Sequence, residues 1–435
     1  MKRPTFAFLA CAVFAATLST LPAQDTDWRR EADERIEALR TSEVWLQVLD
    51  DRGNLLPQGT QVDVRMTRSA FNFGSAIASW KFEQFGEDHP YFQKVPELFN
   101  TIVLENNHKW ANFTDPEKRA HADRLVGWAR EKGLAIRGHG FFWGMTKHPV
   151  IPEPFFTAIK ENEPGMEADL IEAAHAHIRQ AGSELPFVYE WDVINEPVMQ
   201  QVAMKYLGAE TVEAQAAYLA EMFRVADEAA PQANLVMNEY HILAGPRAHE
   251  RYLELAKTLL EMGAPIHGVG FQNHWFNGNM RRDPNEIFAQ MNEYADLGLS
   301  ISITEFDTLW GGWGDDKLEA QGDWLETMLV IAYSHPAVEN FLIWGFWDGQ
   351  HWTNNAPLFL EDWTPKPGHE VWQRLVLDEW RTDESLTIGE QSTVNLRAHH
   401  GDYEVVTELK GRTYRGQVSI GPDTEAERVM LAPES

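Results

Sequence analysis

Short apolar segments alternate with helical segments over most of the chain. The segments predicted as strands are residues 71–77, 101–104, 135–142, 187–194, 235–238, 268–272, 300–304 and 341–346. Between them, apolar side chains recur at helical spacing, as at Leu219, Met222, Phe223 and Ala226. This alternation is typical of an α/β fold in which helices cross a parallel sheet. Eight strands over about 300 residues favour a (β/α)8 TIM barrel over an open doubly wound sheet.

Two further β segments flank the predicted barrel. Residues 44–66 alternate apolar and polar side chains around a turn at 51–54, and residues 394–431 repeat this pattern around a turn at 410–412. We expect these terminal strands to form one small β module. The predicted domains are an N-terminal β segment at 24–68, the (β/α)8 barrel at 69–382, and a C-terminal β segment at 383–435 that packs with the N-terminal strands.

The first 23 residues have the pattern of a secretory signal peptide. Lys2 and Arg3 precede an apolar run at residues 6–21, and Ala23 offers a small side chain for cleavage. The alternative is an uncleaved anchor, but the run is shorter than the roughly 20 apolar residues that span a bilayer. We therefore expect a secreted or periplasmic protein with no membrane association after cleavage. Cys11, the one cysteine, would leave with the signal, which excludes a disulfide framework.

Composition restricts the partners of the chain. It has 66 acidic and 37 basic side chains and a net charge of -29, which argues against binding to nucleic acid or anionic membrane. A hydrophobic content of 44% excludes intrinsic disorder. The chain also has 17 tryptophans, whose flat rings can fill a core or stack on sugars.

Polar and aromatic side chains follow several of the predicted strands. The carboxyl ends of the strands of a (β/α)8 barrel form one face, where active sites are built. The side chains at these ends are Glu105, Asn106, Lys109, Trp110, Arg137, His139, Trp143, Asn195, Glu196, Gln272, Asn273, His274, Glu305, Asp307, Trp344 and Trp352. One such residue alone is usually a solvated charge or a satisfied core group. Their recurrence on several strand ends predicts an active site.

Two carboxyl groups on facing strands favour glycoside hydrolysis. Glu196 follows the fourth predicted strand and Glu305 the seventh, and such a pair can protonate a leaving oxygen and attack an anomeric carbon. The groups that can bind hydroxyls or stack on sugar rings are Lys109, His139, His274, Trp344 and Trp352. A metal centre is the competing use of these histidines and glutamates. No HExxH motif is present and the candidate ligands lie on opposite sides of the barrel, so we expect neither metal nor cofactor.

The motifs that carry these residues resemble glycoside hydrolase family 10, the endo-β-1,4-xylanase family. Residues 191–197 (WDVINEP) and 303–307 (ITEFD) are similar to its acid/base and nucleophile signatures. The similarity continues, in the same order, through residues 105–110, 137–143, 270–274, 344–352, 358–359 and 366–367. It covers the chain from about residue 71 to residue 380.

The resemblance implies that Glu196 is the general acid/base and Glu305 the nucleophile of a retaining double displacement. Glu196 must then start protonated, with its pKa raised by the neighbouring negative charge. The resemblance also implies that Asn195 binds the sugar 2-hydroxyl and that His274 bonds Glu305, with Asp307 behind it. The other implied substrate-binding residues are Glu105, Asn106, Lys109, His139, Trp143, Tyr240, Gln272, Trp344 and Trp352.

Two segments depart from the family pattern. Residues 144–149 (GMTKHP) lack the histidine and glutamine that usually follow Trp143, which alters the glycone side and leaves Lys147 or His148 as substitutes. Glu239 stands where the family usually has aspartate.

We therefore expect a secreted, monomeric, retaining endo-β-1,4-xylanase that hydrolyses internal bonds of xylan. The enzyme alternative acts on short xylo-oligosaccharides or on another β-linked glycan. The non-enzyme alternative is a catalytically silent carbohydrate-binding barrel.

Overall fold

The computed structural model describes residues 25–434. The predicted signal peptide at residues 1–23, with Cys11, lies outside the described residues. Within the described range, no helix combines the length and the apolar character needed to cross a membrane.

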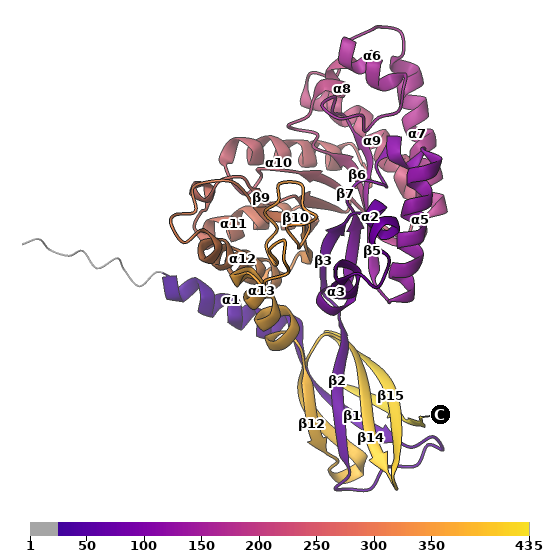
Figure 1. Ribbon diagram of the computed structural model, residues 1–435, viewed down its shortest axis with the longest axis vertical. Helices are drawn as coiled ribbons and strands as arrows, with labels where there is room; N and C mark the ends of the chain where they lie inside the picture. Colours follow the sequence, from indigo (N-terminus) through magenta and orange to yellow (C-terminus); the bar gives the residue numbers. More distant parts are fainter. Residues whose placement is uncertain (1–24, 435) are drawn as a thin grey trace, which may run out of the picture.

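Eight parallel strands form a closed barrel, as the sequence predicted (Figure 1). In spatial order they are β3 (Asn72–Ile77), β4 (Thr101–Leu104), β5 (Ala135–Trp143), β6 (Val188–Asn195), β7 (Asn234–Glu239), β8 (Gly268–Phe271), β10 (Ser300–Thr308) and β11 (Val338–Ile343). The ring closes because β11 pairs with β3. A short strand, β9 (His274–Trp275), pairs with the end of β10. The predicted α/β fold class is confirmed.

Helices surround the barrel. The longer ones are α5 (Pro116–Glu131), α7 (Glu167–Glu184), α9 (Val212–Ala229), α10 (Pro246–Glu261), α11 (Pro284–Ala295), α12 (Lys317–Ser334) and α13 (Pro367–Arg374). Shorter helices lie in the loops: α2 (Trp80–Phe85), α3 (Pro90–Leu98), α4 (Trp110–Phe113), α6 (Phe155–Glu161) and α8 (Val202–Tyr206). The apolar stripe predicted for α9 is buried, including Leu219, Met222 and Phe223. Helix α5 begins at Pro116, where the Asp115 side chain caps the first turn.

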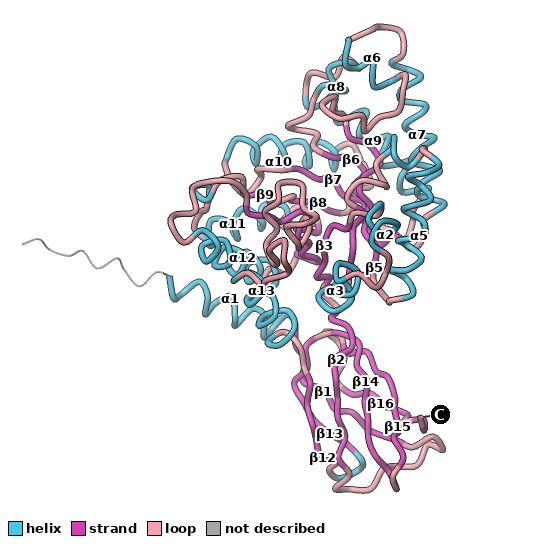
Figure 2. The backbone as a smooth tube through the Cα atoms, viewed as in Figure 1, coloured by secondary structure: helices cyan, strands magenta, loops and turns pink. Residues whose placement is uncertain are grey.

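The terminal strands form a separate β module of two sheets (Figure 2). One sheet has the order β13 (Thr393–His399), β1 (Thr41–Leu49), β16 (Ala426–Met430). The other has the order β12 (Asp383–Thr387), β2 (Gln61–Ser69), β14 (Gly401–Leu409), β15 (Arg412–Ile420), β17 (Ala432–Pro433). Side chains such as Val44, Val64 and Val405 bury a core of their own between the sheets. The predicted small β module, built from both ends of the chain, is confirmed.

Residues 25–40 differ from the expected β segment, because they form helix α1 (Asp25–Arg40). Ion pairs one turn apart stabilise this helix, such as Arg29 with Asp33 and Arg30 with Glu34. Arg29 also bonds Glu326 of α12. The helix therefore belongs to the wall of the barrel rather than to the β module.

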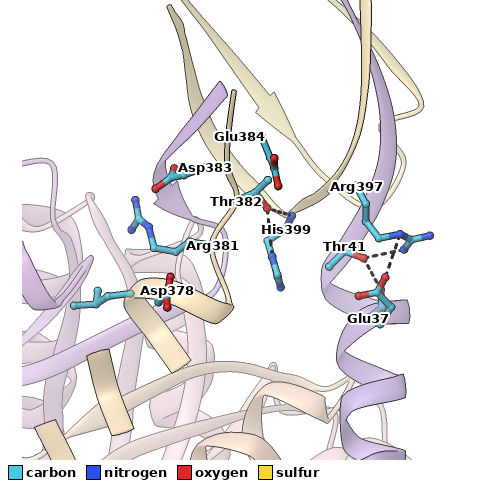
Figure 3. A pocket seen from close by; sticks show the side chains of 10 residues that line it. Glu37, Thr41, Asp378, Arg381, Thr382, Asp383, Glu384, Arg397 and His399 are labelled. Atoms are coloured by element: carbon cyan, nitrogen blue, oxygen red, sulfur yellow. Dashed lines mark hydrogen bonds and ion pairs between the residues drawn. The ribbon is translucent and has the colours of Figure 1, made fainter. Parts of the chain in front are cut away.

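The β module joins the barrel at the amino ends of the barrel strands. Strand β2 leads directly into β3, and Arg68 donates hydrogen bonds to the carbonyls of Asn100 and Gly133, just before β4 and β5. A polar pocket of about 350 Å³ lies at this junction, and Figure 3 shows the Arg397 guanidinium beside Glu37 and Thr41, in contact with both, on one side of it. The carboxyl ends of the strands thus point away from the module.

Candidate active site

Two buried glutamates lie at the carboxyl end of the barrel. Glu196 directly follows β6 and is 7% exposed, and Glu305 lies in β10 and is 3% exposed. A chain of amides connects them. The Gln272 amide donates to Glu196 Oε1 over 3.1 Å and to Asn195 Oδ1 over 3.2 Å, and the Asn238 amide donates to Asn195 Oδ1 over 3.0 Å and to Glu305 Oε1 over 2.8 Å. The two carboxyl groups therefore share one hydrogen-bond network.

Glu196 keeps its proton to a higher pH than an ordinary glutamate, because burial outweighs the hydrogen bonds from Gln272 and Trp143 that favour its charged form. The Trp143 indole donates to Glu196 Oε2 over 3.0 Å, and the backbone of Glu196 is left-handed with φ 55°. Burial raises the pKa of Glu196 to about 7, and the charge of Glu305 adds to the increase. The sequence predicted this direction from the neighbouring charge, but burial is the larger cause.

Glu305 has the opposite tendency. Burial alone would raise the pKa of its carboxyl, but His139 and His274 hold that pKa below its ordinary value. His274 Nε2 lies 3.2 Å from Glu305 Oε2, and His139 Nδ1 lies 3.8 Å from Oε1. Glu305 is therefore ionised at the pH at which Glu196 is still protonated.

His274 connects Glu305 to a second carboxylate. Its Nδ1 lies 2.8 Å from Asp307 Oδ1, and the Trp352 indole donates to Asp307 Oδ2 over 2.8 Å. Burial disfavours the charged imidazole, but Asp307 and Glu305 together raise the pKa of His274 to about 10. At neutral pH the imidazolium donates to both carboxylates and fixes the orientation of Glu305.

A buried ion-pair network supports His139 from inside the barrel. His139 Nδ1 lies 2.6 Å from Asp192 Oδ2, and Asp192 accepts two hydrogen bonds from the Arg137 guanidinium. Arg137 also donates to Glu190 over 2.6 Å. Asp192 and Glu190 were not among the predicted site residues, although both lie in or beside the motif that contains Glu196. Both could have been identified from the sequence, because two carboxyl groups in a strand predicted to be buried need partners for their charges.

The loop after β4 brings a cation to one side of the two glutamates. Lys109 Nζ donates to Asn106 Oδ1 over 2.9 Å and lies 4.9 Å from the centre of the Trp143 ring. Burial lowers the pKa of Lys109 and raises the pKa of Glu105, which lies near it. Trp344 packs edge-on to His139, with ring centres 5.2 Å apart. These groups line the site on the β4 and β5 side.

Tyr240 and Glu239 lie on the opposite side, at the end of β7. Tyr240 accepts a hydrogen bond from Gln200 over 3.4 Å, and burial, with a smaller contribution from the charge of Glu196, raises the pKa of Tyr240 to about 12. Glu239 is fully buried, and its Oε2 accepts the backbone N–H groups of Val198 and Met199 over 2.8 and 3.1 Å. Glu239 thus anchors the loop that follows Glu196. The sequence showed that glutamate stands here in place of the usual aspartate, but it did not predict this contact.

The predicted catalytic and substrate-binding residues lie in or after the carboxyl-terminal parts of the barrel strands, whereas Arg137, also expected at a strand end, lies inside the barrel and pairs with Glu190. The two possible substitutes in the altered loop, Lys147 and His148, are exposed to solvent. Among residues 25–434, no group of three or more His, Cys, Asp or Glu side chains is arranged to hold a metal ion. The site can therefore supply one neutral acid, one carboxylate and several hydrogen-bond donors around them.

The chain is similar in sequence to several known proteins. The family model described as glycosyl hydrolase family 10 matches residues 64–373. The chain is 26% identical over 399 residues to the anti-sigma-I factor RsgI6 of Acetivibrio thermocellus, covering 90% of this chain and 48% of that protein. It is 25% identical over 337 residues to endo-1,4-beta-xylanase B of Paenibacillus barcinonensis, covering 70% of this chain and 95% of that protein.

The chain spans about half the length of RsgI6 and 31% of the length of endo-1,4-beta-xylanase 2 of Arabidopsis thaliana, to which it is 27% identical. Among solved structures, native xylanase 10B from Thermotoga maritima superposes with a TM-score of 0.60 at 26% identity, covering 71% of this chain and 97% of that one.

Proposed function

Because the chain belongs to glycosyl hydrolase family 10, we propose that it is a retaining endo-β-1,4-xylanase that cleaves internal bonds of xylan. The observation that supports glycoside hydrolysis is a pair of buried glutamates in one hydrogen-bond network with opposite pKa shifts, Glu196 upward and Glu305 downward. Such a pair supplies one acid and one carboxylate, and membership of the family supports the retaining mechanism and xylan as substrate. The pattern at residues 1–23 supports the further proposal that the protein is exported.

In the first step the Glu305 carboxylate attacks the anomeric carbon and forms an ester bond to the sugar. The glycosidic C–O bond breaks, and Glu196 transfers its proton to the leaving oxygen. The hydrogen bonds from Asn238 and His274 hold Glu305 in place for the attack. Positioning of this kind lowers the entropic cost of the reaction.

In the second step a water molecule attacks the anomeric carbon of the glycosyl ester, and Glu196 accepts the proton of this water. The sugar–Glu305 bond breaks, and both glutamates return to their starting protonation states. Glu196 can act as a base here because the ester removes the negative charge of Glu305, which lowers the pKa of Glu196. The hydrogen bonds from Trp143 and Gln272 keep Glu196 oriented through both steps.

A polysaccharide panel tests the substrate. We expect the purified protein to release reducing ends from xylan much faster than from carboxymethyl cellulose or mannan, and product sizing should give mixed oligosaccharides because the cleavage is internal. Equal rates on the three polymers would contradict the xylanase proposal, and a faster rate on another β-linked polymer would favour the alternative substrate. Binding to xylan without cleavage would favour a silent binding barrel.

Product stereochemistry tests the retaining mechanism. We expect proton NMR of a reaction started with xylohexaose to show the β anomer first and the α anomer only after mutarotation, because two inversions at one carbon restore its configuration. An initial α product would rule out the ester intermediate on Glu305.

A further inference from the structure

Trp310 is the most exposed of the tryptophans in the part of the chain that the structure describes. Its side chain is 58% exposed, and it lies in the loop that follows β10, the strand of Glu305. None of the motifs identified in the sequence includes it. The exposed flat face of the indole is available to stack on a ligand.

The loop that carries Trp310 is held in a fixed and strained form. Trp310 has a left-handed backbone with φ 37°, which is unfavourable for a bulky side chain. On either side of it, the Leu309 amide donates to the Trp275 carbonyl over 2.8 Å, and the Gly278 amide donates to the Gly311 carbonyl over 3.0 Å. The two loops after β9 and β10 therefore brace each other. Strain maintained in this way is typical of functional sites.

A strip of rings connects Trp310 to the catalytic pair. We define the aromatic strip as His274, Phe276 and Trp310. His274 bonds Glu305; the ring centres of His274 and Phe276 are 5.7 Å apart, and those of Phe276 and Trp310 are 5.1 Å apart. Tyr240 lies beside the middle of the strip, 6.2 Å from Phe276. The strip begins at His274, which contacts Glu305, and ends at the exposed side chain of Trp310.

The order of the strands gives the direction of the strip. Strands β7 and β8 lie between β6, which precedes Glu196, and β10, which carries Glu305. Tyr240 follows β7 and Phe276 follows β9, whereas Lys109 and Trp143 come from β4 and β5 on the other part of the ring. The aromatic strip and Lys109 therefore border opposite sides of the two carboxyl groups. A sugar chain that passes between the glutamates has one end on each side.

We infer that Trp310 stacks on a distal sugar ring of the leaving part of the substrate and makes the enzyme prefer long chains. This inference rests on the proposed function, in which Glu105, Asn106 and Lys109 hold the part that remains on the enzyme. The leaving part then extends over the aromatic strip. Flat aromatic faces suit pyranose rings, and Trp310, two ring contacts from His274, is reached only by a substrate that has sugars beyond the cleaved bond.

The test compares a long substrate with one that has no sugar on the leaving side. We expect Trp310→Ala to lower kcat/KM on xylohexaose by about tenfold, mainly through KM, because a lost stacking contact removes binding that ground state and transition state share. The same variant should keep kcat/KM on 4-nitrophenyl β-xylobioside within about twofold of wild type. Trp310→Phe, which keeps an aromatic face, should recover most of the loss on xylohexaose.

Trp45→Ala is the matched control. Trp45 is 52% exposed but lies on β1 in the β module, at the opposite end of the barrel, so its removal should change neither rate. Unchanged xylohexaose kinetics in Trp310→Ala would overturn the inference and leave the proposed function intact. Equal losses on both substrates would also overturn it, because they indicate a role in folding of the site. If the wild-type chain cleaves neither substrate, the proposed function itself fails.

Discussion

Replacement of Glu305 by alanine is expected to lower kcat on xylan by a factor on the order of 10⁵, because no other group can form the glycosyl ester. The amide of Asn238 and the imidazolium of His274 point at the oxygens of Glu305 and cannot take over the attack, since both are donors. The loss should appear with polymeric xylan and with 4-nitrophenyl β-xylobioside alike. Initial rates at saturating substrate measure it directly.

Azide distinguishes a missing nucleophile from a damaged fold. A small anion can occupy the space left by the Glu305 side chain and attack the anomeric carbon from the same face. We expect added azide to restore turnover of 4-nitrophenyl β-xylobioside in Glu305→Ala and to give an α-glycosyl azide, identified by NMR. Glu131→Ala, at an exposed position at the end of α5, should behave as wild type with and without azide. Near-normal activity in Glu305→Ala would exclude Glu305 as the nucleophile.

The barrel could be predicted from the sequence because its strands are buried on both faces. Residues 101–104 show this most simply: all four side chains of β4 are buried, and Ile102, Val103 and Leu104 follow one another without a polar residue between them. Once the strands are located, the residues at their carboxyl ends follow, and those ends meet on one face. Glu196, Gln272 and Glu305 could therefore be brought together without coordinates.

Contacts between distant segments could not be predicted in this way. The residues of α1 are mostly charged, and their helix is stabilised in part by the tertiary ion pair of Arg29 with Glu326. The hydrogen bonds from the backbone amides of Val198 and Met199 to Glu239 form only because the loop after β6 lies against the end of β7. Trp310 belongs to no motif, and its relation to the site depends on Phe276 in a neighbouring loop.

The pKa split of the catalytic pair depends on the same three-dimensional details. The family resemblance implies that Glu196 is the carboxyl group that keeps the proton, but the sequence does not show the main physical causes. These are the burial of Glu196, which outweighs the hydrogen bonds from Gln272 and Trp143, and the placement of His139 and His274 against Glu305. These positions give the pH dependence of activity a definite form.

We expect kcat/KM on xylan to fall as the pH rises through about 7. The pKa of Glu196 is raised to about 7, and only the protonated form can donate to the leaving oxygen, so activity is present below this pH and lost above it. The acidic limb should lie below the ordinary glutamate range, because the pKa of Glu305 is lowered and its carboxylate must be ionised. A pH–rate profile at substrate concentrations well below KM reports both values.

Replacement of Glu196 by glutamine is expected to remove the alkaline limb and to lower the rate according to the leaving group. General acid catalysis contributes about 10²- to 10⁴-fold, so kcat/KM on xylan, whose leaving alkoxide needs a proton, should fall by about that factor. The 4-nitrophenolate of 4-nitrophenyl β-xylobioside leaves without protonation, so the xylobiosyl ester should still form on Glu305 and give a burst of nitrophenol before its slow hydrolysis. A retained alkaline limb near pH 7 in Glu196→Gln would assign the titrating acid to another group. Equal losses on both substrates would show that the variant disturbs the site as a whole, because only proton donation distinguishes the two leaving groups.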